Sequence, residues 1–266
     1  MSRIRGEERW AANCIHHALV AEVRENDDGS SPGMHDLEIV YENEPPAAVE
    51  VTAAADADSI ELWNLVNGSG RWVEPDIAGG WLVALLPQAR AQRLRAELPA
   101  LLDELERERV SEVRVEPWST GRIERVASEL GITHLVQSGT SYPGSIYFTI
   151  ELPDERSGGF VPQTGDPLAR WLSGWIMQPQ QAHNLRKLMD SGAQERHLFV
   201  ILPGFADAPF SVVDLLMREH PPLPTQPPTL PTEVTHVWIM STWSAGLGIR
   251  WSRDSGWQRF DKLTSS

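Results

Sequence analysis

The sequence predicts a mixed α/β fold on three observations. Stretches with helical hydrophobic spacing alternate with short apolar strands along the whole chain. Hydrophobic residues make up 41% of the 266 residues, which is enough for a sizeable core. A glycine- and proline-rich stretch at 153–167 separates an opening helix–strand–strand order from a closing helix–strand–helix–strand order, with no internal repeat.

The first expected element is a helix over Glu7–Arg24. Ala11, Ile15 and Ala18 recur at the spacing of one helix face, and Glu22 continues the same stripe. A carboxylate on a core-facing stripe is costly unless it is paired or bound to a metal. Glu22 is therefore a candidate metal ligand.

Two strands follow, at 35–41 and 47–52. Apolar and polar residues alternate in both, and the segment 42–46, with its two prolines, supplies a tight turn between them. The pattern predicts an antiparallel pair with one apolar and one partly acidic face.

Each of these strands carries an acid on its less apolar face, Asp36 on the first strand and Glu50 on the second. In the expected register Asp36 lies near Thr52 and Ala53, a short way along the ladder from Glu50. Because paired strands lie about 4.8 Å apart, the two carboxylates could grip one divalent cation. The alternative is a surface hairpin with solvated acids.

The rest of the chain continues the alternation. Further helices are expected at 58–66, 88–109, 122–130, 168–176, 180–189 and 210–218. Further strands are expected at 80–86, 113–116, 132–137, 145–151, 196–202 and 234–241, with the fourth paired to the third. A terminal hairpin at 246–251 and 257–260 and an extended proline-rich connector at 221–231 complete the prediction.

Composition limits the function classes. A net charge of −14 argues against a broad electrostatic grip on nucleic acid, although 88–125 is richer in arginine than 1–60. The amino terminus has no signal-peptide pattern and the apolar runs are too short to cross a bilayer, so a cytoplasmic protein without a membrane partner is expected. The single cysteine, Cys14, excludes an internal disulfide and a multi-cysteine zinc site.

Several familiar chemistries are not indicated. The sequence contains no nucleophile-elbow, zinc-protease, dinucleotide or phosphate-loop motif. His134, His197 and His236 lie in or beside expected strands without a partner at ligand spacing, so they are predicted to be structural. The tryptophans, such as Trp63 and Trp81, lie in apolar elements and are predicted to belong to the core.

The acidic strand pair resembles the PD-(D/E)XK nuclease superfamily. An acid on a first helix, Asp36 on one strand and Glu50-Val51-Thr52 on the next follow the motif of its variants in which the final lysine is replaced. The segments 184–200 and 234–241 would supply the next core helix and strands. The resemblance implies a restriction-endonuclease-like core, a helix with a mixed central sheet and flanking helices, formed by 1–56 and 167–266. It leaves 57–166 as a large α+β insertion, which could still pack as one domain with the core.

The resemblance also implies roles for individual residues. Asp36 and Glu50 would be carboxylate ligands of Mg²⁺ or Mn²⁺, the carbonyl of Val51 would complete the shell, and Glu22 would be the extra acid. Such an ion would activate a water and stabilise charge on a scissile phosphate.

The chain departs from the motif at its lysine. Thr52 stands in that position and cannot supply a positive charge, whereas Lys187, on the helix expected at 180–189, could reach the site instead. The alternative for Lys187 is a solvated helix lysine, in which case the domain would only bind.

The expected function is metal-dependent hydrolysis of phosphodiester bonds in nucleic acid, in DNA repair or in defence. Two alternatives stay open: a catalytically inactive nuclease-fold interaction module, and an unrelated α/β protein that binds a protein or a glycan. The sequence does not indicate an oligomeric state.

Overall fold

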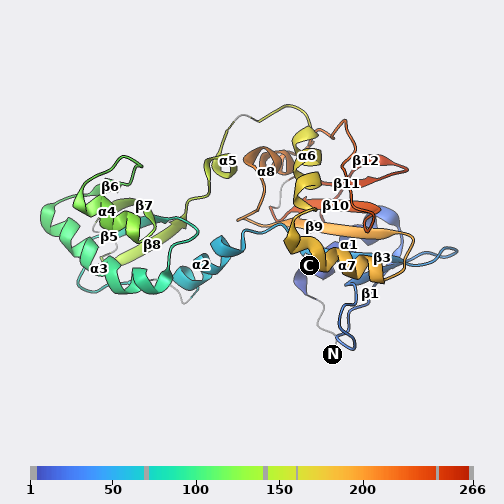
Figure 1. Ribbon diagram of the computed structural model, residues 1–266, viewed down its shortest axis with the longest axis horizontal. Coiled ribbons are helices and arrows are strands. Elements are labelled where there is room, and N and C mark those ends of the chain that lie inside the picture. The colour runs from blue at the N-terminus through green and yellow to red at the C-terminus, as the bar shows by residue number, and fades with distance from the viewer. Residues whose placement is uncertain (1–4, 69–71, 140–142, 160, 244–245, 264–266) are drawn as a thin grey trace. The chain divides into compact units, whose positions relative to one another are not determined.

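The computed structural model describes residues 5–68, 72–139, 143–159, 161–243 and 246–263. Figure 1 shows that the chain forms two compact units, and we call Met1–Ala55 with Gly158–Ser266 unit 1 and Asp56–Ser157 unit 2. Unit 2 is thus inserted into unit 1. The insertion predicted at 57–166 is too long at its carboxyl end. The observed insertion ends at Ser157, and the glycine-rich stretch that follows belongs to unit 1.

Unit 1 contains one mixed seven-stranded sheet. Its strands are β1 (Glu22–Glu25), β2 (Leu37–Val40), β3 (Ala47–Ala53), β9 (Arg196–Leu202), β10 (His236–Ser241), β11 (Gly248–Ser252) and β12 (Gly256–Phe260). They lie in the order β1-β2-β3-β9-β10-β11-β12. The central strands β3, β9 and β10 are parallel, and the outer pairs on both sides are antiparallel. The predicted α/β class is confirmed, as are the expected hairpins β2–β3 and β11–β12.

Helices cover both faces of this sheet (Figure 1). They are α1 (Gly6–Leu19), α6 (Asp166–Trp175), the 3-10 turn η1 (Pro179–Gln181), α7 (Ala182–Asp190) and α8 (Phe210–Met217). The buried stripe of α1 packs on one face, which we call the α1 face. Apolar residues of α6, α7 and α8 pack on the other, which we call the α7 face.

Strand β9 shows how the two cores divide. Leu198 and Val200 belong to the α7-face core, whereas Phe199 and Ile201 belong to the α1-face core. All four are at most 1% exposed, as expected for a parallel strand with helices on both sides. The alternation fixes the face of every side chain on the neighbouring strands.

The first helix ends earlier than its hydrophobic stripe predicts. Val20 adopts a left-handed conformation with φ 55°, which ends α1 at Leu19 and turns the chain into β1. The predicted helix end at Arg24 is therefore wrong. Glu22 lies on a strand, and the stripe argument that made it core-facing does not apply.

Unit 2 contains a five-stranded sheet in the order β4-β8-β5-β7-β6. Its elements are α2 (Ala57–Asn67), β4 (Trp72–Val73), β5 (Gly80–Leu85), α3 (Ala91–Glu108), β6 (Glu112–Arg114), α4 (Arg122–Glu129), β7 (Ile132–Gly139), β8 (Ser145–Ile150) and α5 (Asp154–Ser157). The expected pairing of β7 with β8 is wrong, because β5 lies between them, antiparallel to β7 and parallel to β8.

The long helix α3 supplies much of the core of unit 2. Its leucines share one buried face: Leu94, Leu98, Leu101, Leu102 and Leu105. Trp81 is fully buried as predicted, but Trp63 is 38% exposed, so the core assignment of Trp63 is wrong. In the part of the chain that the structure describes, none of the helices has both the length and the apolar character needed to span a bilayer.

Candidate active site

The two acids singled out in the sequence lie side by side in unit 1. Asp36 immediately precedes β2 and Glu50 lies in β3. The ladder pairs Leu37 with Val49, so one step further along it Asp36 stands opposite Glu50. Each acid is 2% exposed. The expected register, with Asp36 beside Thr52, is wrong, and the observed register brings the carboxyl groups closer together.

Lys187 of α7 reaches both carboxyl groups. Its Nζ donates to Glu50 Oε1 at 2.9 Å and to Asp36 Oδ1 at 3.4 Å. Only 12% of its side chain is exposed, so the alternative of a solvated lysine is wrong. The helix is held in place by Leu188, which is buried in the α7-face core, and this directs the neighbouring Lys187 along β3.

A backbone hydrogen bond fixes the aspartate. The amide N–H of Val51 donates to Asp36 Oδ2 at 2.8 Å. One oxygen of Asp36 is therefore held by the backbone of β3, while the other faces Lys187. Glu50 is attached differently: its Oε2 is buried and has no hydrogen-bond partner among the described residues.

The site contains more buried negative charge than Lys187 can balance. Burial raises the pKa of Glu50 to about 8, the charge of Asp36 adds to this effect, and Lys187 only partly offsets it. Burial also raises the pKa of Asp36, despite the Val51 N–H and Lys187. Burial lowers the pKa of Lys187, but its hydrogen bond to Glu50 and the two acids outweigh this and raise it. Near neutral pH the site therefore retains a proton, and an added cation would replace it.

A second layer of polar side chains joins α7 to β3. Asn184 Nδ2 donates to Thr52 Oγ1 at 3.1 Å and to Gln181 Oε1 at 3.1 Å. Gln181 is 5% exposed. Thr52, in the position where the nuclease motif has its lysine, is thus bound to Asn184, and Lys187 follows Asn184 one helical turn later on the same side of α7.

The amino end of α1 contributes a further acid. Glu8 is 8% exposed, and Arg5 is ion-paired with Glu8 and lies 3.4 Å from Asp36 Oδ1. The charge of Glu8 adds to the rise in the pKa of Asp36. Sequence reasoning missed Glu8, although the stripe through Ala11 and Ile15, followed towards the amino terminus, leads to it.

Glu22 does not belong to this site. It lies on β1 opposite Val40, four residues along β2 from Asp36, which corresponds to roughly 13 Å. Its side chain is 59% exposed and pairs with Arg24 at 2.8 Å. The prediction of Glu22 as a metal ligand is therefore wrong, and the acid that α1 places near Asp36 is Glu8.

No family model, curated protein or solved structure matches this chain.

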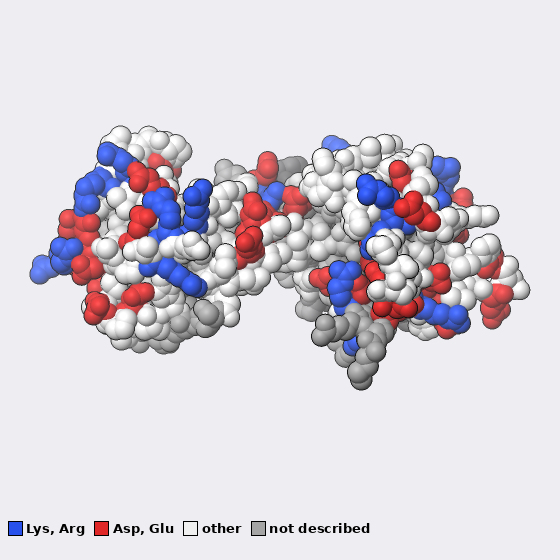
Figure 2. Space-filling model, turned by 60° about the horizontal axis from the view of Figure 1, so that its bottom comes forward, with Lys and Arg blue, Asp and Glu red and all other residues white. Residues whose placement is uncertain are grey.

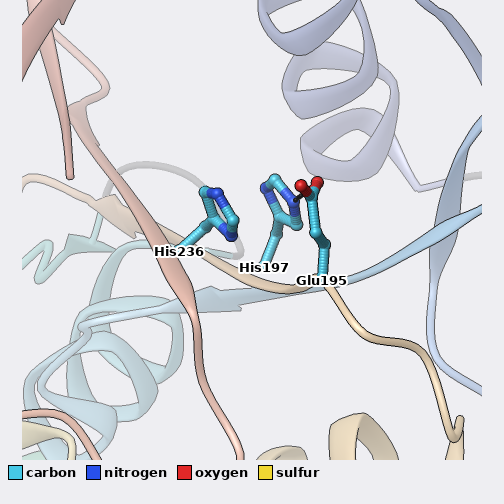
Figure 3. A group of neighbouring side chains, drawn as sticks. All are labelled: Glu195, His197 and His236. Atoms are coloured by element: carbon cyan, nitrogen blue, oxygen red, sulfur yellow. Dashed lines mark hydrogen bonds and ion pairs between the residues drawn. The ribbon is translucent and has the colours of Figure 1, made fainter. Parts of the chain in front are cut away.

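A second cluster lies on the α1 face of the same sheet. Glu195 precedes β9, His197 lies in β9, and His236 lies in β10, directly opposite His197 in the parallel register. Figure 3 shows the three side chains on one side of the two strands, with the Glu195 carboxylate next to the His197 ring. The sequence gives these histidines no partner at ligand spacing, and the structure nevertheless brings His197 and His236 together with Glu195. Strand pairing brings them together across a sequence separation that no spacing motif covers.

Hydrogen bonds link this cluster to Trp238 and Tyr41. The indole N–H of Trp238 donates to His197 Nδ1 at 3.0 Å. Because an indole nitrogen can only donate, Nδ1 carries the lone pair and the proton of the neutral ring is on Nε2. That Nε2 lies 3.4 Å from Glu195 Oε2, which also accepts from the Tyr41 hydroxyl at 2.8 Å.

The surroundings set the charge states in this cluster. Burial lowers the pKa of His197, and burial followed by the charge of His197 lowers that of His236 to about 4. The hydrogen bond from His197, supported by the one from Tyr41, lowers the pKa of Glu195 to about 2. At neutral pH the two imidazoles are therefore neutral and Glu195 is ionised.

The ligand atoms of Glu195, His197 and His236 lie within 4.8 Å of one another, so the group could hold a metal ion. The rings are stacked, however, with centroids 4.2 Å apart and planes 4° from parallel. A metal ion lies near the plane of each imidazole that binds it. Binding would therefore require His236 to turn and His197 to release its Nε2 proton, at the cost of the Trp238 hydrogen bond.

Proposed function

We propose that unit 1 is a restriction-endonuclease-like domain that hydrolyses phosphodiester bonds in nucleic acid with a divalent metal ion. The observation that carries the proposal is the meeting of Asp36, Glu50 and Lys187 from three separate elements. Buried carboxylates and an ammonium at one point are costly, and such arrangements concentrate at functional sites.

The order of elements supports the nuclease-like core. Helix α1 leads into the antiparallel strands β1, β2 and β3, and α7 then leads into β9, parallel to β3. The resemblance of the acidic motif implies a helix, a mixed sheet and flanking helices, and the presence of these features in unit 1 supports the proposal. Unit 2 enters as an insertion after β3.

The donor set fits Mg²⁺ or Mn²⁺. Glu50 Oε2 is a buried acceptor without a hydrogen-bond partner, and carboxylate oxygens are the ligands that these hard cations prefer. Asp36 and Glu50 would hold the ion, with the carbonyl of Val51 expected nearby. When bound, such an ion lowers the pKa of a water and stabilises charge on phosphate.

The remaining side chains have separate roles in this proposal. Lys187 supplies the positive charge that Thr52 cannot, at a place where it can orient a water or a phosphate oxygen. Asn184 positions Thr52, and Gln181 positions Asn184. Glu50, whose pKa is about 8, accepts or releases a proton as the cation leaves or enters.

The surface suggests a limited contact with nucleic acid. On the face shown in Figure 2, Lys and Arg side chains are interspersed with Asp and Glu in both units. Together with the net charge of −14, this favours contact with a short stretch of backbone rather than a long electrostatic track.

Cleavage assays test the proposal. Labelled single- and double-stranded DNA and RNA are incubated with the protein in Mg²⁺, Mn²⁺ or EDTA. We expect cation-dependent cleavage that falls by at least about 100-fold in Glu50→Gln and Asp36→Asn, a loss typical of removing a group that stabilises transition-state charge. Glu22→Gln, a matched change of an exposed acid, is the control and should cleave normally. Cleavage that persists in Glu50→Gln would refute the assignment.

Two observations favour a second candidate, a cleavage-dead nuclease fold that serves as an interaction module. Thr52 replaces the motif lysine, and Lys187 already bridges the two carboxyl groups. Lack of turnover by the wild-type protein on all four substrates, with retained binding of a divalent cation, would support this candidate.

A further inference from the structure

A polar cavity of about 170 Å³ opens on the α1 face of unit 1, beyond the carboxyl end of α1. Its wall includes the Glu195–His197–His236 cluster, and Arg250 lies on the same wall. Ser252 and Gln258 add a hydroxyl and an amide to the lining. The Asp36–Glu50 site faces the other side of the sheet, since Glu50 alternates with Val49 and Val51 of the α1-face core.

Arg250 is a half-buried cation that forms no ion pair among the described residues. It lies on β11 opposite Trp238, and its guanidinium carbon is 5.1 Å from the centre of the Trp238 ring. Its Nε is buried without a hydrogen-bond partner, and no ion pair of Arg250 is found in the described part of the chain. Burial lowers the pKa of Arg250, and the interaction with Tyr41 only partly offsets this effect.

The acid in the cavity wall, Glu195, forms no ion pair with Arg250 in the described part of the chain. Glu195 Oε2 accepts from Tyr41 and faces His197, so that oxygen is already occupied. A guanidinium has five N–H donors in a planar fork, and a buried donor without an acceptor is costly. The geometry therefore leaves a place for an acceptor beside Arg250.

We propose that this cavity binds a small tetrahedral oxyanion, a phosphate group, through Arg250. The planar fork of an arginine matches the oxygens of phosphate and can donate to two of them at once. Ser252 and Gln258 supply further donors from neighbouring positions of β11 and β12. The proposal does not rest on the nuclease function.

An oxyanion fits the cavity better than a cation does. The proton on His197 Nε2 and the stacking of the two rings both oppose a metal ion at Glu195, His197 and His236. The guanidinium of Arg250 would also repel a cation placed beside it, and an anion has to bind at Arg250 rather than beside the ionised Glu195, which repels it. An anion next to Arg250 leaves the hydrogen bonds of His197 and Glu195 intact and supplies an acceptor for Arg250 Nε.

Phosphate titration followed by isothermal calorimetry tests this. Inorganic phosphate is the first probe, and a dinucleotide with and without a 5′-phosphate separates a free anion from the end of a nucleic-acid chain. We expect Arg250→Gln to weaken binding about tenfold to a hundredfold, the effect of losing charge-assisted hydrogen bonds. Arg253→Gln removes the same charge from an exposed neighbouring position and should bind like the wild type.

The position of the bound phosphate and the folding of the variants are checked separately. On adding phosphate, the N–H resonances of Arg250 Nε and Trp238 Nε1 should shift. If Arg250→Gln does not fold by circular dichroism, Arg250→Lys keeps the charge but loses the fork and should still bind more weakly. Equal binding by the wild type, Arg250→Lys and Arg250→Gln would overturn the proposal, as would no phosphate binding or an equal effect of Arg253→Gln. Zn²⁺ binding that is lost in His236→Ala, without phosphate binding, would overturn it in favour of a metal site.

Discussion

Replacing Glu50 by glutamine should change how the stability of unit 1 depends on pH. The folded protein holds the pKa of Glu50 at about 8, against an ordinary value of 4.5, because the carboxyl is buried beside Asp36. The folded state therefore binds a proton more tightly than the unfolded chain. This contribution to stability is complete below about pH 4.5 and is lost as the pH rises through 8.

The size of the effect follows from the shift. Each pKa unit corresponds to about 1.4 kcal/mol, so the full change for Glu50 is a few kcal/mol, with about 5 kcal/mol as the upper limit. Glutamine has nearly the same shape and does not titrate. We expect the free energy of unfolding of the wild type to fall relative to Glu50→Gln by this amount between pH 5 and pH 9.

Two measurements check the reasoning. Carboxyl ¹³C NMR should show one glutamate titrating near pH 8 in the wild type, and this signal should disappear in Glu50→Gln. Urea unfolding at a series of pH values gives the free energy of unfolding of each protein as a function of pH. The difference between the two pH dependences does not contain any constant cost of placing the amide beside Lys187. Glu22→Gln, in which an exposed acid with a lowered pKa is changed, should show no such difference.

A divalent cation should reverse the pH effect in the wild type only, because it replaces the proton and binds the folded state. A Glu50 titration midpoint below about pH 5.5, near that of an ordinary glutamate, would refute the electrostatic account. Parallel pH dependence of stability in the two proteins would refute it as well.

Two further predictions concern the same unit. Lys187→Met removes the ammonium that contacts both acids. We therefore expect the free energy of unfolding, measured in urea, to fall by about 3–5 kcal/mol at pH 9 and by much less at pH 5, where Glu50 is protonated. An equal loss at both pH values would contradict the ion-pair role. Gly248→Ala would place a Cβ 2.1 Å from the Phe260 ring on the neighbouring strand. We expect overpacking to destabilise the protein by about 1–3 kcal/mol, measured by thermal unfolding. Gly174→Ala, at an open position on α6, is the control and should unfold like the wild type.

The sequence by itself determined the faces of the residues in β2 and β3. Alternation in 35–41 and 47–52 places Leu37 and Val49 in the core and Asp36 and Glu50 on the opposite face, because successive side chains of a strand point to opposite sides. The same local rule located most helices and strands to within a few residues. These features depend only on neighbours in the chain.

The end of α1 was not determined in this way. The apolar stripe continues to Glu22, but a left-handed residue at Val20 ends the helix, and the local pattern does not distinguish the two outcomes. The acid of α1 whose charge acts on Asp36 is Glu8 and not Glu22, because α1 ends at Leu19 and packs on the sheet through its buried stripe.

Only the tertiary structure decided which distant residues meet. Lys187 reaches Glu50 because α7 packs against β3, and His236 meets His197 because β10 lies parallel to β9 in one register. The packing of a helix and the register between distant strands are set by the whole core, through the burial of side chains such as Leu188 and Phe199. No local pattern contains that information, so the contact of Lys187 with the two acids and the Glu195–His197–His236 cluster form only once the sheet is assembled.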